Sequence, residues 1–250
     1  MTWNLFNIFS SAKEEQSMIT DYSSVKVDMH SHLIPGIDDG AKTIEESIAL
    51  IKSLHSAGFT RLITTPHIMS DYFKNTPEII NEGLGVVRAA ILKENIPVNI
   101  DAAAEYYIDD GFMQKLEGEK LMTFGDNYLL VEISYMNPPD NIKEIFFRAM
   151  LLGYKPVLAH PERYPYWYNN FDEYKSIRDS GIALQMNLNS LSGYYGPEAK
   201  KLAEKLIDHG MVDMVGSDMH HLKHAAALQR CLSDKYINKL FELHLLNRYL

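Results

Sequence analysis

The sequence is poor in cysteine and in long apolar runs. Cys231 is the one cysteine, so no disulfide can form within a single chain, which is typical of a reducing compartment. No apolar run approaches the roughly 20 residues that a membrane-spanning helix needs. The first residues lack the basic start and apolar core of a signal peptide. We therefore expect a cytoplasmic protein without a transmembrane segment.

Positive charge is also scarce. The chain has 24 lysines and arginines against 33 acidic residues, a formal net charge of -9. Broad binding to nucleic acid or to anionic membranes requires a basic surface, so we expect neither kind of partner. If the substrate is a phosphate, bound cations or a local arginine must attract it.

What the sequence does contain is an alternation of strand-like and helix-like segments from residue 25 onward. About seven β–α units follow one another without a linker. A parallel sheet closed into a barrel is the natural solution, and an open doubly wound sheet is the alternative. Thr43, with Glu46 three residues later, is a suitable N-cap for one helix. The expected strands are 25–29, 61–65, 98–102, 128–133, 156–159, 183–188 and 212–215, and the expected helices are 43–57, 77–95, 138–152, 172–180, 197–209 and 223 to the end.

Ionisable side chains recur directly after the expected strands. In a β/α barrel the carboxyl ends of all strands share one face, so such residues would meet in one pocket. A single histidine or glutamate at a strand end is usually structural, but so many at this position are hard to attribute to chance. The candidates are Asp28, His30, His32, Asp38, Asp39, His67, Glu105, Glu132, His160, Asp218 and His220. Four other histidines, His55, His209, His221 and His244, lie in helical or surface contexts, and we expect structural roles for them.

The spacing of these residues favours a metal centre. His30 and His32 are two residues apart, which puts both rings on one face of an extended segment, and Asp218 and His220 repeat this spacing. All donor atoms are nitrogen and oxygen, which suits Zn, Mn or Fe. Nine of these residues, all except Asp28 and Asp38, are the candidate ligands, which exceed the needs of one ion and fit two or three. Three divalent cations would outweigh four carboxylates and leave a positive pocket that binds phosphate and ionises a water.

Arg163 is the candidate phosphate-binding and catalytic residue. It follows His160 by three positions, from where a guanidinium can reach back and hold phosphate oxygens in bidentate fashion. The alternative for Arg163 is a surface salt bridge with the neighbouring Glu162. Tyr106, Tyr107 and Tyr164 either line a groove for an aromatic phosphate or pack at the barrel rim.

The segments DMHSHLIPGIDDG, TTPH, AAAEYY, VEIS, AHPERY and SDMH occur in this order. Together they resemble the PHP (polymerase and histidinol phosphatase) superfamily, most closely its bacterial capsule-associated tyrosine-protein phosphatases of the CpsB/YwqE type. The resemblance implies an α/β fold, a single-domain distorted (β/α)7 TIM-like barrel over residues 25–250, with residues 1–24 as an N-terminal extension. It also implies three cations, with manganese favoured over iron or zinc. Their ligands would be His30, His32, Glu105 and Asp218 for the first, Glu105, Glu132 and His160 for the second, and Asp39, His67 and His220 for the third.

The resemblance further implies a reaction and a partner. A metal-bound hydroxide would attack phosphotyrosine, with Arg163 on the phosphate. The substrate would be the tyrosine-rich tail of a bacterial tyrosine kinase that controls capsule or exopolysaccharide synthesis. The sequence departs from the family at one point, because relatives often carry a second arginine shortly after DMH. Here the chain reads HLKHAAALQR, so Lys223 or His224 is the candidate replacement.

Other functions remain as alternatives. A cysteine-based phosphatase is excluded, because the position six residues after Cys231 holds Ile237 and not arginine. A second PHP activity, on histidinol phosphate or another small phosphomonoester, is the first alternative. The net charge argues against a polymerase-associated nuclease. The complete set of candidate ligands argues against a non-catalytic scaffold of the capsule machinery.

Overall fold

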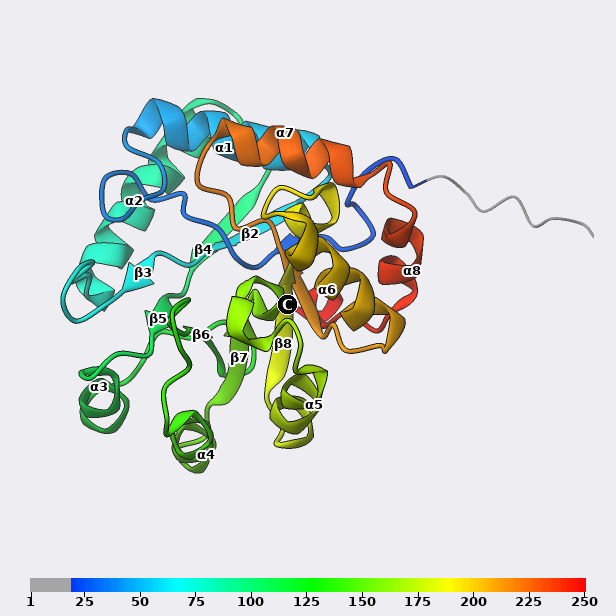
Figure 1. Ribbon diagram of the computed structural model, residues 1–250. Helices are drawn as coiled ribbons and strands as arrows, with labels where there is room; N and C mark the ends of the chain where they lie inside the picture. The colour runs from blue at the N-terminus through cyan, green and yellow to red at the C-terminus, as the bar shows by residue number, and fades with distance from the viewer. Residues whose placement is uncertain (1–18) are drawn as a thin grey trace, which may run out of the picture.

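The computed structural model describes residues 19–250, so residues 1–18 of the expected N-terminal extension lie outside the described residues. The described part contains two parallel sheets (Figure 1). One consists of β1 (Val27–Asp28), β2 (Arg61–Thr64) and β4 (Asn99–Ala102). The other has the order β3 (His67–Ile68), β5 (Glu105–Tyr107), β6 (Tyr128–Glu132), β7 (Lys155–Ala159), β8 (Ala183–Asn187) and β9 (Met214–Gly216).

The two sheets form one barrel-like array. Strand β2 leads into β3 through residues 65–66, and β4 leads into β5 through residues 103–104. At the other edge an isolated parallel bridge joins Ser31 to Met219, and the amide of His32 donates to the Met219 carbonyl at 2.9 Å. The chain therefore folds as a distorted α/β barrel, as predicted, and not as an open sheet.

The helices lie outside the strands (Figure 1). The predicted last helix is wrong in one respect, because two helices and a final 3-10 turn occupy that segment. A helix at 112–118 was not expected. The described helices are α1 (Ile44–Ser56), α2 (Pro77–Lys93), α3 (Phe112–Gly118), α4 (Ile142–Leu151), α5 (Phe171–Asp179), α6 (Pro197–Asp208), α7 (Leu222–Cys231) and α8 (Tyr236–Glu242). Within residues 19–250, none of them is long and apolar enough to cross a membrane.

Helix α1 begins where the sequence predicts. Thr43 is extended, and its side chain accepts a hydrogen bond from the amide of Glu46. The Glu46 carboxylate in turn accepts from the amide of Lys42 at 2.7 Å, a reciprocal arrangement that satisfies two otherwise unpaired donors. The helix packs against α2 and α7. This cap fixes the start of α1 next to the loop that carries Asp38 and Asp39.

A small apolar cluster occupies the inside of the barrel. Its members come from strands on all sides, which include β1, β2, β6, β7 and β9. The C-terminal segment covers this cluster, because Leu246 and Leu250 pack against it and Asn247 bonds the carbonyls of Val27 and Val215. The polar face of the barrel is therefore the one formed by the carboxyl ends of the strands.

Candidate metal centre

The polar residues predicted at the strand ends lie together around one pocket of about 430 Å³. Eight of the ten predicted site residues line it: Asp39, His67, Glu105, Glu132, His160, Arg163, Asp218 and His220. The remaining two, His30 and His32, are fully buried and contact the same glutamate, Glu105. The fold therefore brings all ten side chains into one cluster.

Glu105 is the centre of this cluster. Its Oε2 lies 3.1 Å from His30 Nε2, 3.4 Å from His32 Nε2 and 3.2 Å from His67 Nδ1. Its Oε1 lies 3.2 Å from His160 Nε2. Each oxygen of one carboxylate thus faces a different part of the histidine cluster, which is the arrangement that a bridging ligand requires.

Ligand atoms from the cluster converge in three groups. Within each group the donor atoms all lie within 4.8 Å of one another. The groups are His32, Asp39, His67 and His220; His30, His32 and Glu105; and His67, Glu105 and Glu132. These groups overlap, because His32, His67 and Glu105 each fall in two of them. They differ from the predicted ligand sets in that His160 and Asp218 belong to none of the three.

Burial and neighbouring charges shift the pKa values of several residues in the cluster. Burial, together with the neighbouring Glu105 carboxylate, raises the pKa of Glu132 to about 8. Burial opposes protonation of His30, but Glu105 and Asp218 outweigh it and raise the pKa of His30 to about 9. Burial and the charge of Arg163 lower the pKa of His160 to about 4. Buried carboxylates this close together keep their negative charge only if a positive charge lies beside them, and protons or bound cations can supply it.

Divalent cations fit this donor set. His67 Nδ1 is buried and has no hydrogen-bond partner among residues 19–250, although it lies 3.2 Å from Glu105 Oε2. The donors are all imidazole nitrogens and carboxylate oxygens, the ligands that Zn, Mn and Fe accept. The residues present therefore suit a small cluster of such ions.

A layer of polar residues behind the cluster holds the histidines. Asp38 Oδ2 accepts from His32 Nδ1 at 2.7 Å, and Gln185 Oε1 accepts from His30 Nδ1 at 2.8 Å. Because Asp38 and Gln185 bind the Nδ1 atoms, the Nε2 atoms of His32 and His30 are free to face the pocket. Asn187 Nδ2 donates to Asp218 Oδ2 at 2.7 Å. We had not predicted Gln185 and Asn187, yet two amides on one face of an otherwise apolar strand were a readable signal.

Two glycines permit the close packing of these histidines. A Cβ on Gly216 would lie 2.5 Å from the Cβ of His30, and a Cβ on Gly40 would lie 2.5 Å from the Cβ of His32. Real Cβ atoms do not approach so closely. The backbone of each glycine therefore forms the wall against which its histidine packs.

Arg163 points into the pocket and not toward Glu162. Its Nη1 donates to Asp218 Oδ2 at 2.8 Å, and its guanidinium lies 4.2 Å from the ring centre of Tyr195 and 5.0 Å from that of Tyr135. Glu162 instead bonds the amide of Asn187 within the core. The alternative of a surface salt bridge is therefore wrong.

The pocket is not lined by Tyr106, Tyr107 or Tyr164, for which pocket lining and rim packing are the two alternatives. Tyr106 and Tyr164 are buried, and their hydroxyls bond backbone atoms, so they are packing residues. The tyrosines that line the pocket are Tyr135, Tyr194 and Tyr195. Tyr135 follows Glu132 by three residues and was within reach of the VEIS motif, whereas Tyr194 and Tyr195 belong to none of the motifs.

The segment after Asp218 also lines the pocket. His221 is among the lining residues, contrary to the structural role expected for it. Of the two residues considered as replacements for an arginine, His224 lines the pocket and Lys223 does not. His224 is buried, and its Nδ1 accepts from the amide of His220 at 3.2 Å.

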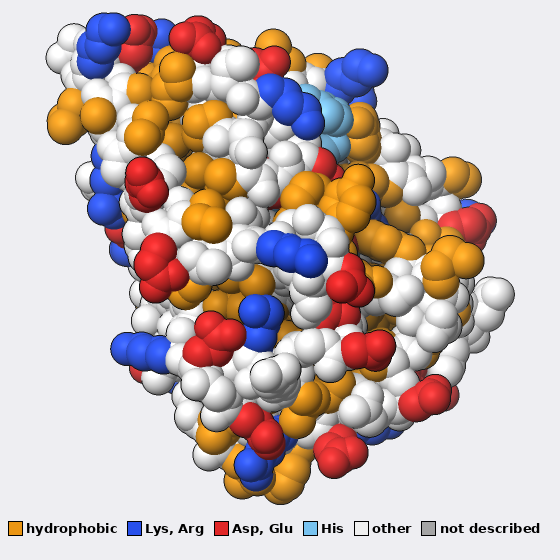
Figure 2. Space-filling model, turned by 90° about the vertical axis from the view of Figure 1, so that its left-hand side faces the viewer, with side chains coloured by type: hydrophobic (Ala, Val, Ile, Leu, Met, Phe, Trp, Pro, Cys, Tyr) orange, Lys and Arg blue, Asp and Glu red, His pale blue; other side chains and the backbone are white. Residues whose placement is uncertain are grey.

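The surface on the α2 side of the molecule carries charges of both signs. On the face seen in Figure 2, which is the left side of Figure 1 and carries α2, acidic and basic side chains alternate. No continuous basic patch forms on that face.

Comparison with known proteins places these features in context. Residues 26–248 match the family described as capsular polysaccharide synthesis, CpsB/CapC. The chain is similar to the tyrosine-protein phosphatase YwqE of Bacillus subtilis, with 30% identity over 79% of this chain and 78% of the relative. It is also similar to the tyrosine-protein phosphatase CpsB of Streptococcus pneumoniae, with 31% identity over 78% of this chain and 83% of the relative.

The chain is also similar to solved structures. A crystal structure from the study of YwqE and CpsB, described as metal-dependent tyrosine phosphatases, matches with a TM-score of 0.76 and 28% identity. The match covers 89% of this chain and 90% of the solved one. Histidinol phosphate phosphatase from Lactococcus lactis matches with a TM-score of 0.54 at 13% identity over 88% of this chain and 95% of the solved one, a likeness of fold alone.

Proposed function

Because the chain belongs to the CpsB/CapC family of capsular polysaccharide synthesis, we propose that it is a metal-dependent protein-tyrosine phosphatase. Residues 25–250 form the catalytic domain. The substrate is a phosphotyrosine protein, the tail of a bacterial tyrosine kinase that controls capsule or exopolysaccharide synthesis. We further propose that the enzyme acts in the cytoplasm, which agrees with its single, unpaired cysteine.

The observation that carries this proposal is the position of Glu105. Its two oxygens face histidines on opposite sides of the cluster, so that it can bridge two cations. We assign three ions, with manganese favoured, to the following ligands. The first takes His30, His32, Glu105 and Asp218; the second takes Glu105, Glu132 and His160; the third takes Asp39, His67 and His220.

These ions, when bound, would supply Lewis acidity and lower the pKa of the attacking water. The residues of the chain supply the rest. Arg163 binds the phosphate oxygens, for which its guanidinium is held between Tyr195 and Tyr135 beside Asp218. The same tyrosines provide an aromatic rim against which the ring of the substrate tyrosine can pack. The tyrosinate that leaves is a stable anion, so a strong general acid is not required.

Cys231 takes no part in this chemistry. It is fully buried in α7, its thiol donates to the Leu188 carbonyl at 3.0 Å, and burial raises its pKa to about 11. A thiol in this environment is neither ionised nor accessible to a phosphate.

The test is a comparison of substrates with the purified protein and manganese. We expect a phosphotyrosine peptide to be hydrolysed far faster than histidinol phosphate, a phosphoserine peptide or a DNA end. The reverse ranking would contradict the proposal.

Two variants test the metal assignment. His30→Ala and Asp218→Ala should abolish activity and lower the bound metal. His209→Ala is the matched control, since His209 is exposed at the end of α6 and away from the cluster. Full activity in both cluster variants would refute the assignment.

A further inference from the structure

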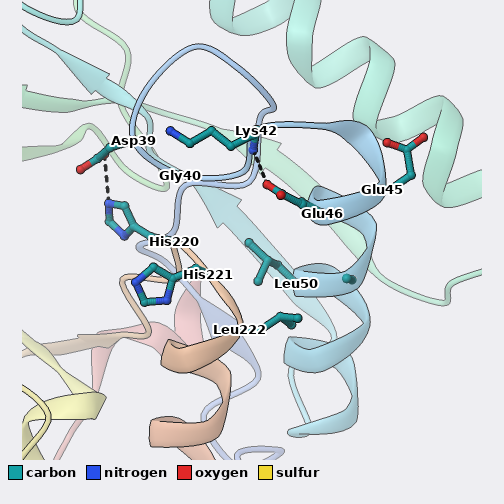
Figure 3. Close-up of a pocket in the computed structure, with 10 residues that line it drawn as sticks. Asp39, Gly40, Lys42, Glu45, Glu46, Leu50, His220, His221 and Leu222 are labelled. Atoms are coloured by element: carbon teal, nitrogen blue, oxygen red, sulfur yellow. Dashed lines mark hydrogen bonds and ion pairs between the residues drawn. The ribbon is translucent and has the colours of Figure 1, made fainter.

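A groove of about 570 Å³ runs between α1 and the start of α7 (Figure 3). Its walls are mainly apolar and include Ala49, Leu50 and Leu222. Leu222, at the first turn of α7, is 58% exposed. Ala49 is partly exposed, whereas Leu50 is only 2% exposed, so the accessible apolar surface of the groove comes from Leu222 and Ala49.

The groove is continuous with the metal pocket. Asp39, His220 and His221 line both cavities. Asp39 Oδ1 lies 3.2 Å from His220 Nε2, and this pair forms the boundary between the two (Figure 3). A ligand that fills the metal pocket and continues outward can enter the groove across this pair.

We propose that the groove binds the polypeptide segment that flanks the phosphotyrosine of the substrate, with an apolar side chain packed against Ala49 and Leu222. This inference rests on the proposed function, because it assumes a phosphotyrosine in the metal pocket. The phosphorylated residue belongs to a chain, and that chain must leave the pocket along the surface. The apolar groove begins at the edge of the pocket and offers such a path.

The charges of the groove restrict which side chain it accepts. Glu45 and Glu46 line it on the α1 side, and Lys42 lines it near the boundary with the metal pocket. The side chain of Lys42 extends toward Asp39 (Figure 3). The two glutamates disfavour an acidic side chain in the apolar part, so the groove should select an aliphatic residue over glutamate.

The experiment uses the manganese-loaded enzyme and two kinds of substrate. The first kind is a set of phosphotyrosine peptides in a Gly/Ser background, with leucine or glutamate at each of four positions on either side of the phosphotyrosine. The second is p-nitrophenyl phosphate, which is too small to reach the groove. We expect wild-type kcat/KM to favour leucine over glutamate about tenfold at one or two positions.

The groove variant is Leu222→Glu, and Ala49→Glu is a second variant in case the first folds poorly. Either should abolish the leucine preference through a higher KM for the peptide. Leu151→Glu on α4 is the matched control, since Leu151 is 61% exposed and remote from the groove in the chain. Leu151→Glu should keep the wild-type preference for leucine over glutamate.

The outcomes separate this inference from the proposed function. If the wild type hydrolyses the phosphotyrosine peptides but shows no position-dependent preference, or if the preference survives in both variants, the groove is not a substrate subsite. If the variants change only the oligomeric state, the groove is a contact between copies of the chain and the inference is wrong. If the wild type hydrolyses no phosphotyrosine at all, the proposed function fails and the inference fails with it.

Discussion

Replacing Asp38 with alanine should weaken metal binding without removing a proposed ligand. Asp38 is 7% exposed and lies behind the cluster. Its Oδ2 accepts from His32 Nδ1 at 2.7 Å and from the amide of His67 at 3.2 Å, and its Oδ1 accepts from the amide of Gly40 at 2.9 Å. One carboxylate thus fixes the ring of His32 and the backbone at His67.

The expected loss follows from these contacts. Partners that orient a metal-binding histidine through its second nitrogen contribute 10–100-fold in affinity, which is about 1.4–2.7 kcal/mol. The alanine variant leaves the ring of His32 without its Nδ1 partner, so the ring is no longer held in one orientation. Three lost hydrogen bonds, at about 1 kcal/mol each, should lower the free energy of unfolding as well.

The assay is a competition titration of manganese and zinc against a chelator, together with denaturant unfolding. Asp109→Ala is a matched control, because Asp109 also accepts three hydrogen bonds in a loop: from the amide and hydroxyl of Ser70 and from the amide of Gly111. Both variants should be less stable, but only Asp38→Ala should bind metal less tightly. Equal metal affinities in Asp38→Ala and the wild type would refute the reasoning.

Three further predictions concern the same pocket. At pH 7 the metal-free protein holds a proton on His30, whose pKa is raised to about 9, and on Glu132, whose pKa is raised to about 8. The pKa of His32 is also raised well above its ordinary value. Metal binding should therefore release at least two protons at pH 7 and strengthen as pH rises toward 9, which calorimetry in buffers of different ionisation heat would detect; heats that do not depend on the buffer would contradict it. Arg163→Lys should lower kcat/KM on phosphotyrosine about 10–100-fold while the bound metal is unchanged, because an ammonium cannot form the bidentate contact; steady-state kinetics and metal analysis would show whether both parts hold. Gly216→Ala should displace His30 and lower the amount of bound metal, as measured by elemental analysis. A variant that keeps its full metal content would show that the backbone at residue 216 can move to accommodate the methyl group.

Much of the fold could be predicted because it depends on local sequence. The cap at Thr43 and the apolar runs 128–133 and 183–188 are signals within a few residues, and they gave elements close to the observed ones. The C-terminal segment was harder. A helix-like pattern from residue 223 conceals the break between α7 and α8, where the side chain of Asp234 accepts from the amide of Tyr236, the first residue of α8.

For the candidate site, the sequence by itself determined which side chains are available. Polar residues at the carboxyl ends of parallel strands must share one face of a barrel, so the grouping of His30, Glu105 and Asp218 follows from the order of the elements alone. The roles of these residues as metal ligands remain a prediction. The spacing of two residues in His30 and His32 likewise determined that both rings lie on one side.

Only the tertiary structure decided how these groups pair. Of two adjacent aspartates, Asp38 holds His32 and Asp39 faces His220, a choice that depends on how the loop packs against Gly40. The contact between Arg163 and Asp218, and the groove between α1 and α7, join segments far apart in the chain. Local patterns carry no information about such contacts, because they form only when the barrel closes and brings its first and last strands together.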